Sequence, residues 1–331
     1  MRLLVLGGTA FAGRAVAAEA LRRGHDVVCA ARGESGGVPD GARLVRVDRD
    51  APDGLAPVAG EEFDAVVDVA PSSFPWVRRA LAAFADRVGH WTFVSTINVY
   101  ADDATLGQTP ATGPLVPALE RHATRADLMA DGGTQLYGGI KVAAENAVRA
   151  ALGDRAFVVR PGLITGPGDD SDRFGYWPAR GGRALVPDAP GRLVQHLDVR
   201  DLAAWLVTAS ETGLGGTFDG VGPAVPLGEL LPGIAAAVDA VVELVPVPAE
   251  RLTSAGVNPW GGPRSLPLWV PEELAGVAAH DAAPSLAAGL AVRPLADTVA
   301  GALATERERG LDRPRRAGLS AAEEAEVLAG L

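Results

Sequence analysis

The chain contains a single lysine, Lys141, which follows Tyr137 by four residues in the run Tyr-Gly-Gly-Ile-Lys. In a helix, this spacing puts both side chains on one face. An ammonium group beside a phenol favours the phenolate form and brings the tyrosine closer to the range in which it exchanges protons with a substrate. Arginine supplies every other fixed positive side-chain charge, and it lacks the compact, adjustable ammonium of lysine. We interpret the pair as a candidate acid–base site; the alternative is a lysine present by chance.

A third polar group is expected beside this pair, at the end of a strand. The apolar run that ends at Val94 is followed directly by Ser95 and Thr96. Open α/β sheets bind ligands at the carboxyl ends of their strands. Either hydroxyl is therefore a candidate partner for Tyr137 and Lys141.

Short apolar runs alternate with longer helical patterns through the first half of the chain, as is typical of βαβ units and a parallel sheet. The predicted strands are 2–6, 27–30, 44–47, 65–69, 91–95 and 157–160. The predicted helices are 13–23, 75–84 and a long one that begins before residue 137 and runs to 151. A helix over 196–210 and a strand over 217–220 are predicted to return to the sheet.

The expected fold is therefore α/β: a doubly wound parallel Rossmann sheet with a smaller C-terminal α/β substrate lobe. Residues 1–165, joined by 196–220, are predicted to form the Rossmann domain, and 166–195 with 221–331 the lobe. A helix is predicted over 119–129, and a capping box at Ser320–Glu323 predicts the start of a last helix. Residues 102–131 form a long connection, which we interpret as a lid; the alternative is an inert surface insertion.

A glycine-rich turn, Gly-Gly-Thr-Ala-Phe-Ala-Gly over residues 7–13, follows the first predicted strand and opens the first helix. Gly7 permits a tight turn, and Gly13 lets the helix pack closely on the sheet. The amides at the start of the helix can bind phosphate. The position of the turn predicts a dinucleotide-binding site.

The end of the second strand bears on which dinucleotide is bound. NAD-selective folds usually carry an acidic residue there, whereas this strand ends in Cys-Ala-Ala followed by Arg32. Arg14, just after the glycine-rich turn, is predicted to converge on the same place. Two guanidinium groups suit a 2′-phosphate. We therefore predict NADP rather than NAD; the alternative is that both are surface arginines.

Together these motifs resemble the extended branch of the short-chain dehydrogenase/reductase superfamily, often labelled NAD-dependent epimerase/dehydratase. The resemblance covers residues 1–220. Besides the motifs above, it rests on the following segments: Val47-Asp48, Val67-Asp68-Val69-Ala70, Ser95-Thr96 with Val99-Tyr100, Arg160-Pro161-Gly162, Gly166-Pro167-Gly168-Asp169 and His196 to Asp201.

The resemblance implies that Tyr137 is the acid/base and that Lys141 holds the nicotinamide ribose and lowers the pKa of the tyrosine. It implies that Thr96, or alternatively Ser95, bonds the substrate carbonyl while a hydride passes to or from the nicotinamide. The expected cofactor-binding residues are Gly7, Thr9, Ala10, Phe11, Gly13, Arg14, Arg32, Asp48, Val69, Ala70, Ser95, Lys141, Pro161, Gly162, Leu163 and Ile164. A homodimer is common in the family.

The substrate site has a weaker signature. Ser72, Arg173, Trp177 and His196 are the candidates for contacting a small-molecule substrate. The aromatic side chains that are further candidates for lining a pocket are Phe74, Trp76, Tyr176, Trp260 and Trp269, although for each of them core packing is the favoured interpretation. No histidine spacing suggests a metal site, and we predict none.

Composition narrows the function further. A net charge of −11 argues against nonspecific nucleic-acid binding. The one cysteine, Cys29, suits a reducing cytoplasm. No segment of the sequence has the length and apolarity that a membrane span requires. The leading hypothesis is an NADP-dependent carbonyl reductase or alcohol dehydrogenase of a small metabolite. The alternatives are a sugar-nucleotide epimerase or dehydratase with tightly bound NAD, and a non-catalytic NAD(P)-binding regulator.

Overall fold

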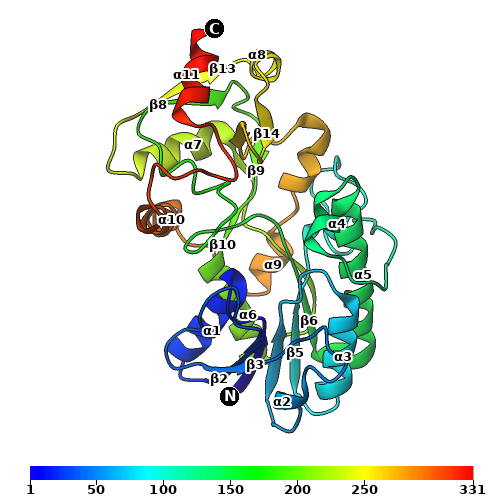
Figure 1. Cartoon of the computed structure of the whole chain (residues 1–331). Helices are drawn as coiled ribbons and strands as arrows, with labels where there is room; N and C mark the ends of the chain where they lie inside the picture. Colours follow the sequence, from blue (N-terminus) through cyan, green and yellow to red (C-terminus); the bar gives the residue numbers. More distant parts are fainter. Residues whose placement is uncertain (331) are drawn as a thin grey trace.

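Seven parallel strands form the central sheet of the computed structural model, which describes residues 1–330 (Figure 1). Their order across the sheet is β11-β6-β5-β4-β1-β2-β3. The strands are β1 (Arg2–Leu6), β2 (Asp26–Ala31), β3 (Arg43–Arg46), β4 (Ala65–Asp68), β5 (His90–Val94), β6 (Ala156–Pro161) and β11 (Gly216–Gly220). The order reverses between β1 and β4, and this reversal opens a crevice at the carboxyl ends of those strands.

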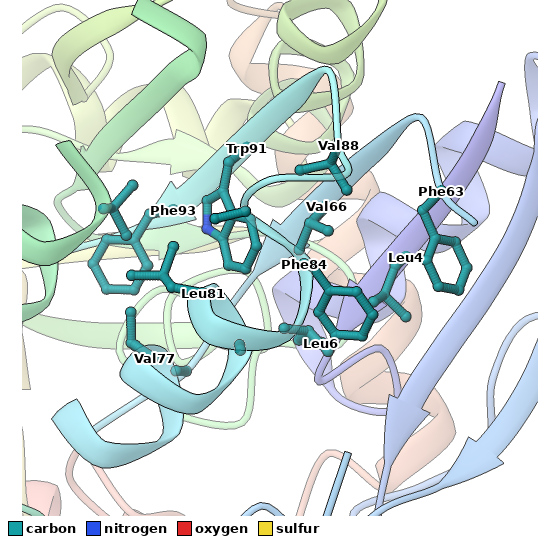
Figure 2. Packing of buried hydrophobic residues seen from close by; sticks show 14 of the residues in the cluster. Leu4, Leu6, Phe63, Val66, Val77, Leu81, Phe84, Val88, Trp91 and Phe93 are labelled. Carbon is teal, nitrogen blue, oxygen red and sulfur yellow. The ribbon is translucent and has the colours of Figure 1, made fainter. Parts of the chain in front are cut away.

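Helices cover both faces of the sheet (Figure 1). On one face α1 (Phe11–Arg22) packs against α6 (Val199–Thr212), and on the other α3 (Phe74–Phe84) packs against α5 (Gly133–Leu152). The inner strands are largely buried because each face meets an apolar helix side, whereas the edge strand β3 is partly exposed. Figure 2 shows the core under α3, where Phe84 and Leu81 pack on Trp91 and Val66 of the sheet.

The remaining elements build a smaller lobe beyond the carboxyl edge of the sheet, at the top of Figure 1. Its paired strands are β8 (Gly182–Pro187) with β13 (Val242–Val247), β9 (Leu193–Val194) with β12 (Val225–Pro226), and β14 (Asn258–Trp260) with β15 (Ser265–Pro267). Its helices are α7 (Leu227–Ala236), α8 (Ala249–Ser254), α10 (Leu295–Arg309) and α11 (Ala321–Ala329). A separate apolar core, which includes Phe174, Trp177 and Leu268, holds the lobe together.

Short elements complete the chain: α2 (Ala56–Ala59), α4 (Arg125–Met129), α9 (Ala283–Ala287), β7 (Ile164–Thr165), β10 (Leu197–Asp198), η1 (Ile97–Val99), η2 (Gly153–Arg155) and η3 (Glu272–Ala278). Within residues 1–330, no helix has the length and apolarity needed to cross a membrane.

The α/β fold, the parallel sheet and the smaller lobe are confirmed. The capping box at Ser320 is also present, with both of its hydrogen bonds. Two element predictions were wrong in extent. The helix predicted over 119–129 covers only Arg125–Met129, because the preceding residues pair in extended form with the loop after β4. The helix predicted over 196–210 begins at Val199, after Asp198 has formed the strand β10 and the N-terminal cap.

Candidate active site

A cavity of about 520 Å³ lies at the reversal of strand order. Its lining comes from the ends of the strands on both sides of β1. The lining residues include Gly7, Thr9, Ala10, Phe11, Gly13, Arg32, Val69, Ala70, Ser95, Thr96, Tyr137, Lys141, Pro161, Gly162 and Ile164. The fold thus brings the glycine-rich turn and the Tyr–Lys pair, which are far apart in sequence, to one cavity.

The glycine-rich turn at this cavity has the geometry of a phosphate cradle. Gly7 has a φ of +103°, which favours glycine, and a Cβ on Gly13 would lie 2.3 Å from the carbonyl oxygen of Gly7. Ala10 caps α1 without a side-chain hydrogen bond, so no side chain occupies the amides of the first turn. These amides fit the pyrophosphate of a dinucleotide.

A buried ion pair borders the other end of the cavity. Arg49 follows β3 and donates from both terminal nitrogens to Asp68 at the end of β4, at 2.7 and 3.0 Å. The guanidinium of Arg49 also lies 5.5 Å from the ring centroid of Trp76, and both residues line the cavity. Asp48, the expected adenine contact, is exposed and does not line the cavity.

The two arginines expected at a 2′-phosphate are placed differently. Arg32 lines the cavity with a side chain that is 52% exposed, 3.5 Å from the carboxylate of Glu34. Arg14 is exposed on α1 and does not line the cavity. The predicted convergence of two guanidinium groups is therefore absent from the cavity wall, and Arg32 is the arginine that remains there.

Lys141 reaches the cavity from the interior of the protein. Its ammonium donates to the carbonyl oxygens of Ala70, at 2.6 Å, and Val94, at 2.7 Å, and lies 4.9 Å from the ring centroid of Phe93. Two of its three N–H groups are thereby held between the ends of β4 and β5. A planar guanidinium does not match this arrangement, which gives a structural reason for the chain's one lysine. Burial lowers the pKa of Lys141 to about 7.

Tyr137 is half-buried one turn earlier in α5, and its ring centroid lies 5.6 Å from the Lys141 ammonium. Burial raises the pKa of Tyr137 to about 12. The expected lowering by the lysine is therefore not what this structure shows, because desolvation of the phenol dominates. The phenol is protonated at neutral pH.

Thr96 and Ser95 differ in what their hydroxyl protons do. Thr96 accepts a hydrogen bond from the amide of Asn98 at 3.2 Å, which leaves its own proton for another acceptor. Ser95 donates its proton to Glu145 at 2.5 Å. Both side chains line the cavity, but Thr96 is the one with a hydroxyl proton that no protein group accepts within residues 1–330.

Glu145 is a residue that the motif analysis missed. It is fully buried one turn beyond Lys141 in α5 and accepts bonds from Ser95, from Arg160 at 3.0 and 2.8 Å, and from Arg149 at 3.0 Å. Burial acts to raise the pKa of Glu145, but the hydrogen bonds and charge of Arg160 outweigh it and hold that pKa below its usual value. Its i, i+4 spacing from Lys141 was the available sequence signal.

The network continues away from the cavity. Arg160 donates to the Tyr100 hydroxyl at 3.0 Å, and that hydroxyl donates to Asp219 at 2.7 Å. The other oxygen of Asp219 lies 3.2 Å from Nδ1 of His280. These side chains join β6, β11 and the chain that returns from the lobe, and they tie the site to the rest of the sheet.

The other five expected ligand-contacting residues all lie outside the cavity lining. Leu163 is buried in the lobe core, and the Ser72 hydroxyl donates a hydrogen bond to the carbonyl oxygen of Ala123 at 3.0 Å. Trp177 is also buried, and its Nε1–H donates to the carbonyl oxygen of Pro267 at 3.0 Å. The structure thus places these three in packing positions outside the cavity. His196 and Arg173 are half-buried; Nδ1 of His196 lies 3.3 Å from the Thr165 hydroxyl, and burial lowers the pKa of His196 to about 4.

The 102–131 segment packs against α5, the helix that carries Tyr137 and Lys141. The amide of Leu119 donates to the carbonyl of Gly139 at 2.8 Å, and a Cβ on Gly139 would lie 2.7 Å from the carbonyl oxygen of Pro117. Gly139 therefore allows a close approach of this segment to α5, whereas Gly138, whose Cβ would lie 2.0 Å from the carbonyl oxygen of Asn98, allows the approach of η1. Residues 117–119 of the segment thus pack on α5, and the lid function stays a prediction.

The NAD dependent epimerase/dehydratase family matches residues 3–217, a range that includes the glycine-rich turn, Thr96, Tyr137 and Lys141. The chain belongs to this family. It is thus an NAD(P)-dependent enzyme of the epimerase/dehydratase family.

A curated relative of this epimerase/dehydratase family chain is the 2′-dehydrokanamycin reductase of Streptomyces kanamyceticus, 34% identical over 179 residues. The match covers 52% of this chain and 45% of the relative, so it spans less than half the length of that protein.

Solved structures share the fold at low identity. The UDP-N-acetylglucosamine 4-epimerase of Bacillus cereus is 18% identical, with a TM-score of 0.64 over 94% of this chain and 100% of the other. The UDP-glucose 4-epimerase of Thermus thermophilus, solved with NAD, is 19% identical, with a TM-score of 0.63 over 93% of this chain and 99% of the other. These similarities establish the architecture of the epimerase/dehydratase chain.

Proposed function

We propose that this protein is an NADP-dependent oxidoreductase that interconverts a carbonyl and an alcohol on a small metabolite. The observation that carries the proposal is a single cavity lined by the phosphate-cradling turn and by Thr96, Tyr137 and Lys141. When bound there, the nicotinamide dinucleotide supplies or accepts the hydride. The glycine-rich turn and the open amides of α1 hold its phosphates.

The side chains divide the remaining work. The Thr96 hydroxyl donates a hydrogen bond to the substrate carbonyl oxygen, since its proton is free and that of Ser95 is bound to Glu145. Tyr137 gives its phenolic proton to that oxygen as the carbonyl carbon is reduced, and the Lys141 ammonium stabilises the phenolate that forms. A phenol that is protonated at neutral pH suits the reductive direction.

The preference for NADP rests on the end of β2. The last residue of the strand is Ala31, at the position where NAD-selective folds usually carry an acid, and the acid that lines the cavity, Glu34, follows three residues later beside Arg32. Arg32 lines the cavity at the position directly after Ala31, and its ion pair with Glu34 is exposed and weak enough to exchange for a phosphate. We expect NADPH to raise the thermal midpoint of the protein more than NADH does. In Arg32→Ala that difference should vanish while stabilisation by NADH persists; an unchanged difference would remove Arg32 from the argument.

The catalytic assignment is tested by Tyr137→Phe. We expect turnover of a carbonyl substrate to fall by about 10²- to 10⁴-fold, the contribution of a positioned acid–base group. Cofactor binding, measured by calorimetry, should stay as in the wild type, because the hydroxyl is not needed to hold the phosphates. Full turnover in this variant would contradict the proposal.

A sugar-nucleotide epimerase or dehydratase is the second candidate, favoured by the shared architecture with the UDP-sugar epimerases. Such an enzyme regenerates its cofactor within each cycle. Protein that purifies with NAD bound, and that converts a sugar nucleotide with no added cofactor, would support this candidate over the reductase.

A further inference from the structure

Arg173, in the segment between β7 and β8, is a half-buried arginine whose charge is not neutralised. Within residues 1–330, its terminal nitrogens meet no hydrogen-bond acceptor and no ion-pair partner. Arg79 and Arg155, which also make no ion pair, donate from their terminal nitrogens to backbone carbonyls instead. Desolvating an unpaired charge is costly, so a fold that retains one usually uses it.

The guanidinium of Arg173 is held in a fixed position. It stacks on Trp260, 5.0 Å from the ring centroid, and its Nε donates to the hydroxyl of Ser171 at 3.3 Å. A Cβ on Gly261 would lie 3.5 Å from two carbons of the Arg173 stem, so the backbone there packs against the side chain. Trp260 itself has a φ of +67°, an uncommon left-handed conformation. Such local backbone strain tends to accumulate at ligand-binding positions.

Asp169 attracts the Arg173 guanidinium but makes no ion pair with it within residues 1–330. Asp169 accepts bonds from the amide and the hydroxyl of Ser171, at 2.8 and 3.1 Å, and burial raises its pKa. Burial likewise lowers the pKa of Arg173, against the attraction of Asp169. The charged face of the guanidinium is therefore left to a group from outside the chain.

A short series of contacts connects this place with the cofactor cavity. Ile164 lines the cavity, and its neighbour Thr165 lies 3.3 Å from His196. The His196 ring packs 5.2 Å from Phe174, the residue after Arg173. Arg173 does not line the cavity itself; it lies in the lobe and is connected to the wall residue Ile164 through Thr165, His196 and Phe174.

We propose that Arg173 and Trp260 form an anion-binding subsite, so that the substrate carries a carboxylate or phosphate at a distance from its reacting carbonyl. This inference rests on the proposed function for the identity of the substrate, but the binding of an anion does not require turnover. The guanidinium fork bonds two oxygens of the anion, and the Trp260 ring, which stacks on the fork, fixes its orientation and shields one face from water.

Calorimetric titration of the full chain with benzoate, phenyl phosphate and neutral benzamide tests the subsite. We expect one or both anions to bind more tightly than benzamide, and the stronger anion tells whether a carboxylate or a phosphate is recognised. In Arg173→Met that affinity should fall by about 10- to 150-fold, the loss of a hydrogen bond to a charged group. Arg173→Lys, which keeps the charge without the fork, should lose less.

Arg183→Met is the matched control, because that arginine is 57% exposed and faces only Glu243, at 3.6 Å. Anion binding that is no tighter than benzamide binding, or that survives Arg173→Met, would overturn the subsite, as would an equal loss in the control. Tyr137→Phe separates this inference from the proposed function, because the variant should lose turnover while its anion affinity stays that of the wild type. If the wild type shows no turnover but its anion binding depends on Arg173, the subsite stands and the reductase proposal fails.

Discussion

Replacing Glu145 by glutamine should destabilise the protein far more than its conservative chemistry suggests. The carboxylate has no exposed surface and accepts four hydrogen bonds, from Ser95, from two nitrogens of Arg160 and from Arg149. Arg160 is also buried, at 2% exposure. Removing one partner of a buried pair leaves the other charge without compensation and costs about 3–5 kcal/mol. We expect a loss of that size in the free energy of unfolding.

Urea denaturation followed by circular dichroism measures this loss. Glu243→Gln is the control, since its pair with Arg183 is exposed and is expected to contribute about 0–1 kcal/mol. The double variant Glu145→Met with Arg160→Met removes both charges, and should therefore be more stable than Glu145→Gln alone. A loss below about 1 kcal/mol in Glu145→Gln would refute the argument that this pair is energetically coupled.

The same reasoning fixes the direction of a pH effect. The pKa of Glu145 is lowered in the folded protein, so the stabilisation from its ionised form is present above the ordinary value of 4.5. It is lost as the pH falls toward the folded pKa. The stability difference between wild type and Glu145→Gln should therefore shrink below pH 4.5, and a difference that grows there would contradict the assignment.

Three further results are expected. Gly13→Ala places a Cβ 2.3 Å from the Gly7 carbonyl oxygen, so it should lower the free energy of unfolding by about 1–3 kcal/mol and weaken cofactor binding. Gly60→Ala, with no atom within 4 Å of its Cβ, should change neither quantity, and equal effects of the two variants in unfolding and calorimetric titrations would contradict this. Because the pKa of Lys141 is lowered to about 7 in the folded protein, the unfolded chain binds more protons than the folded one above pH 7. The free energy of unfolding of the wild type, measured in urea titrations, should therefore rise by about 2 kcal/mol relative to Lys141→Met between pH 7 and 9, and a constant difference would refute this. Thr96→Ala should lower kcat by about 100-fold and Thr96→Ser far less, while the Kd of the cofactor stays unchanged. A kcat of Thr96→Ala equal to that of the wild type would exclude the Thr96 hydroxyl as the donor to the substrate carbonyl.

Local features of this protein could be predicted from the amino-acid sequence. The alternation of short apolar runs with helical patterns predicted the parallel sheet, because burial on both faces requires such strands. The turn over residues 7–13 follows a strand directly, so its site could be placed from spacing alone. The one-turn separation of Tyr137 and Lys141 likewise placed both side chains at the cavity.

Tertiary structure alone decided how the charges are paired and desolvated. Asp48 and Arg49 are adjacent in sequence, yet the first is exposed and the second is buried against Asp68. No spacing rule predicts that difference, because it depends on how the end of β3 lies beside β4. Burial raises the pKa of Tyr137, although the Lys141 ammonium lies one turn away in the same helix. Desolvation is a sum over residues distant in sequence, and so it is fixed only when the chain has folded.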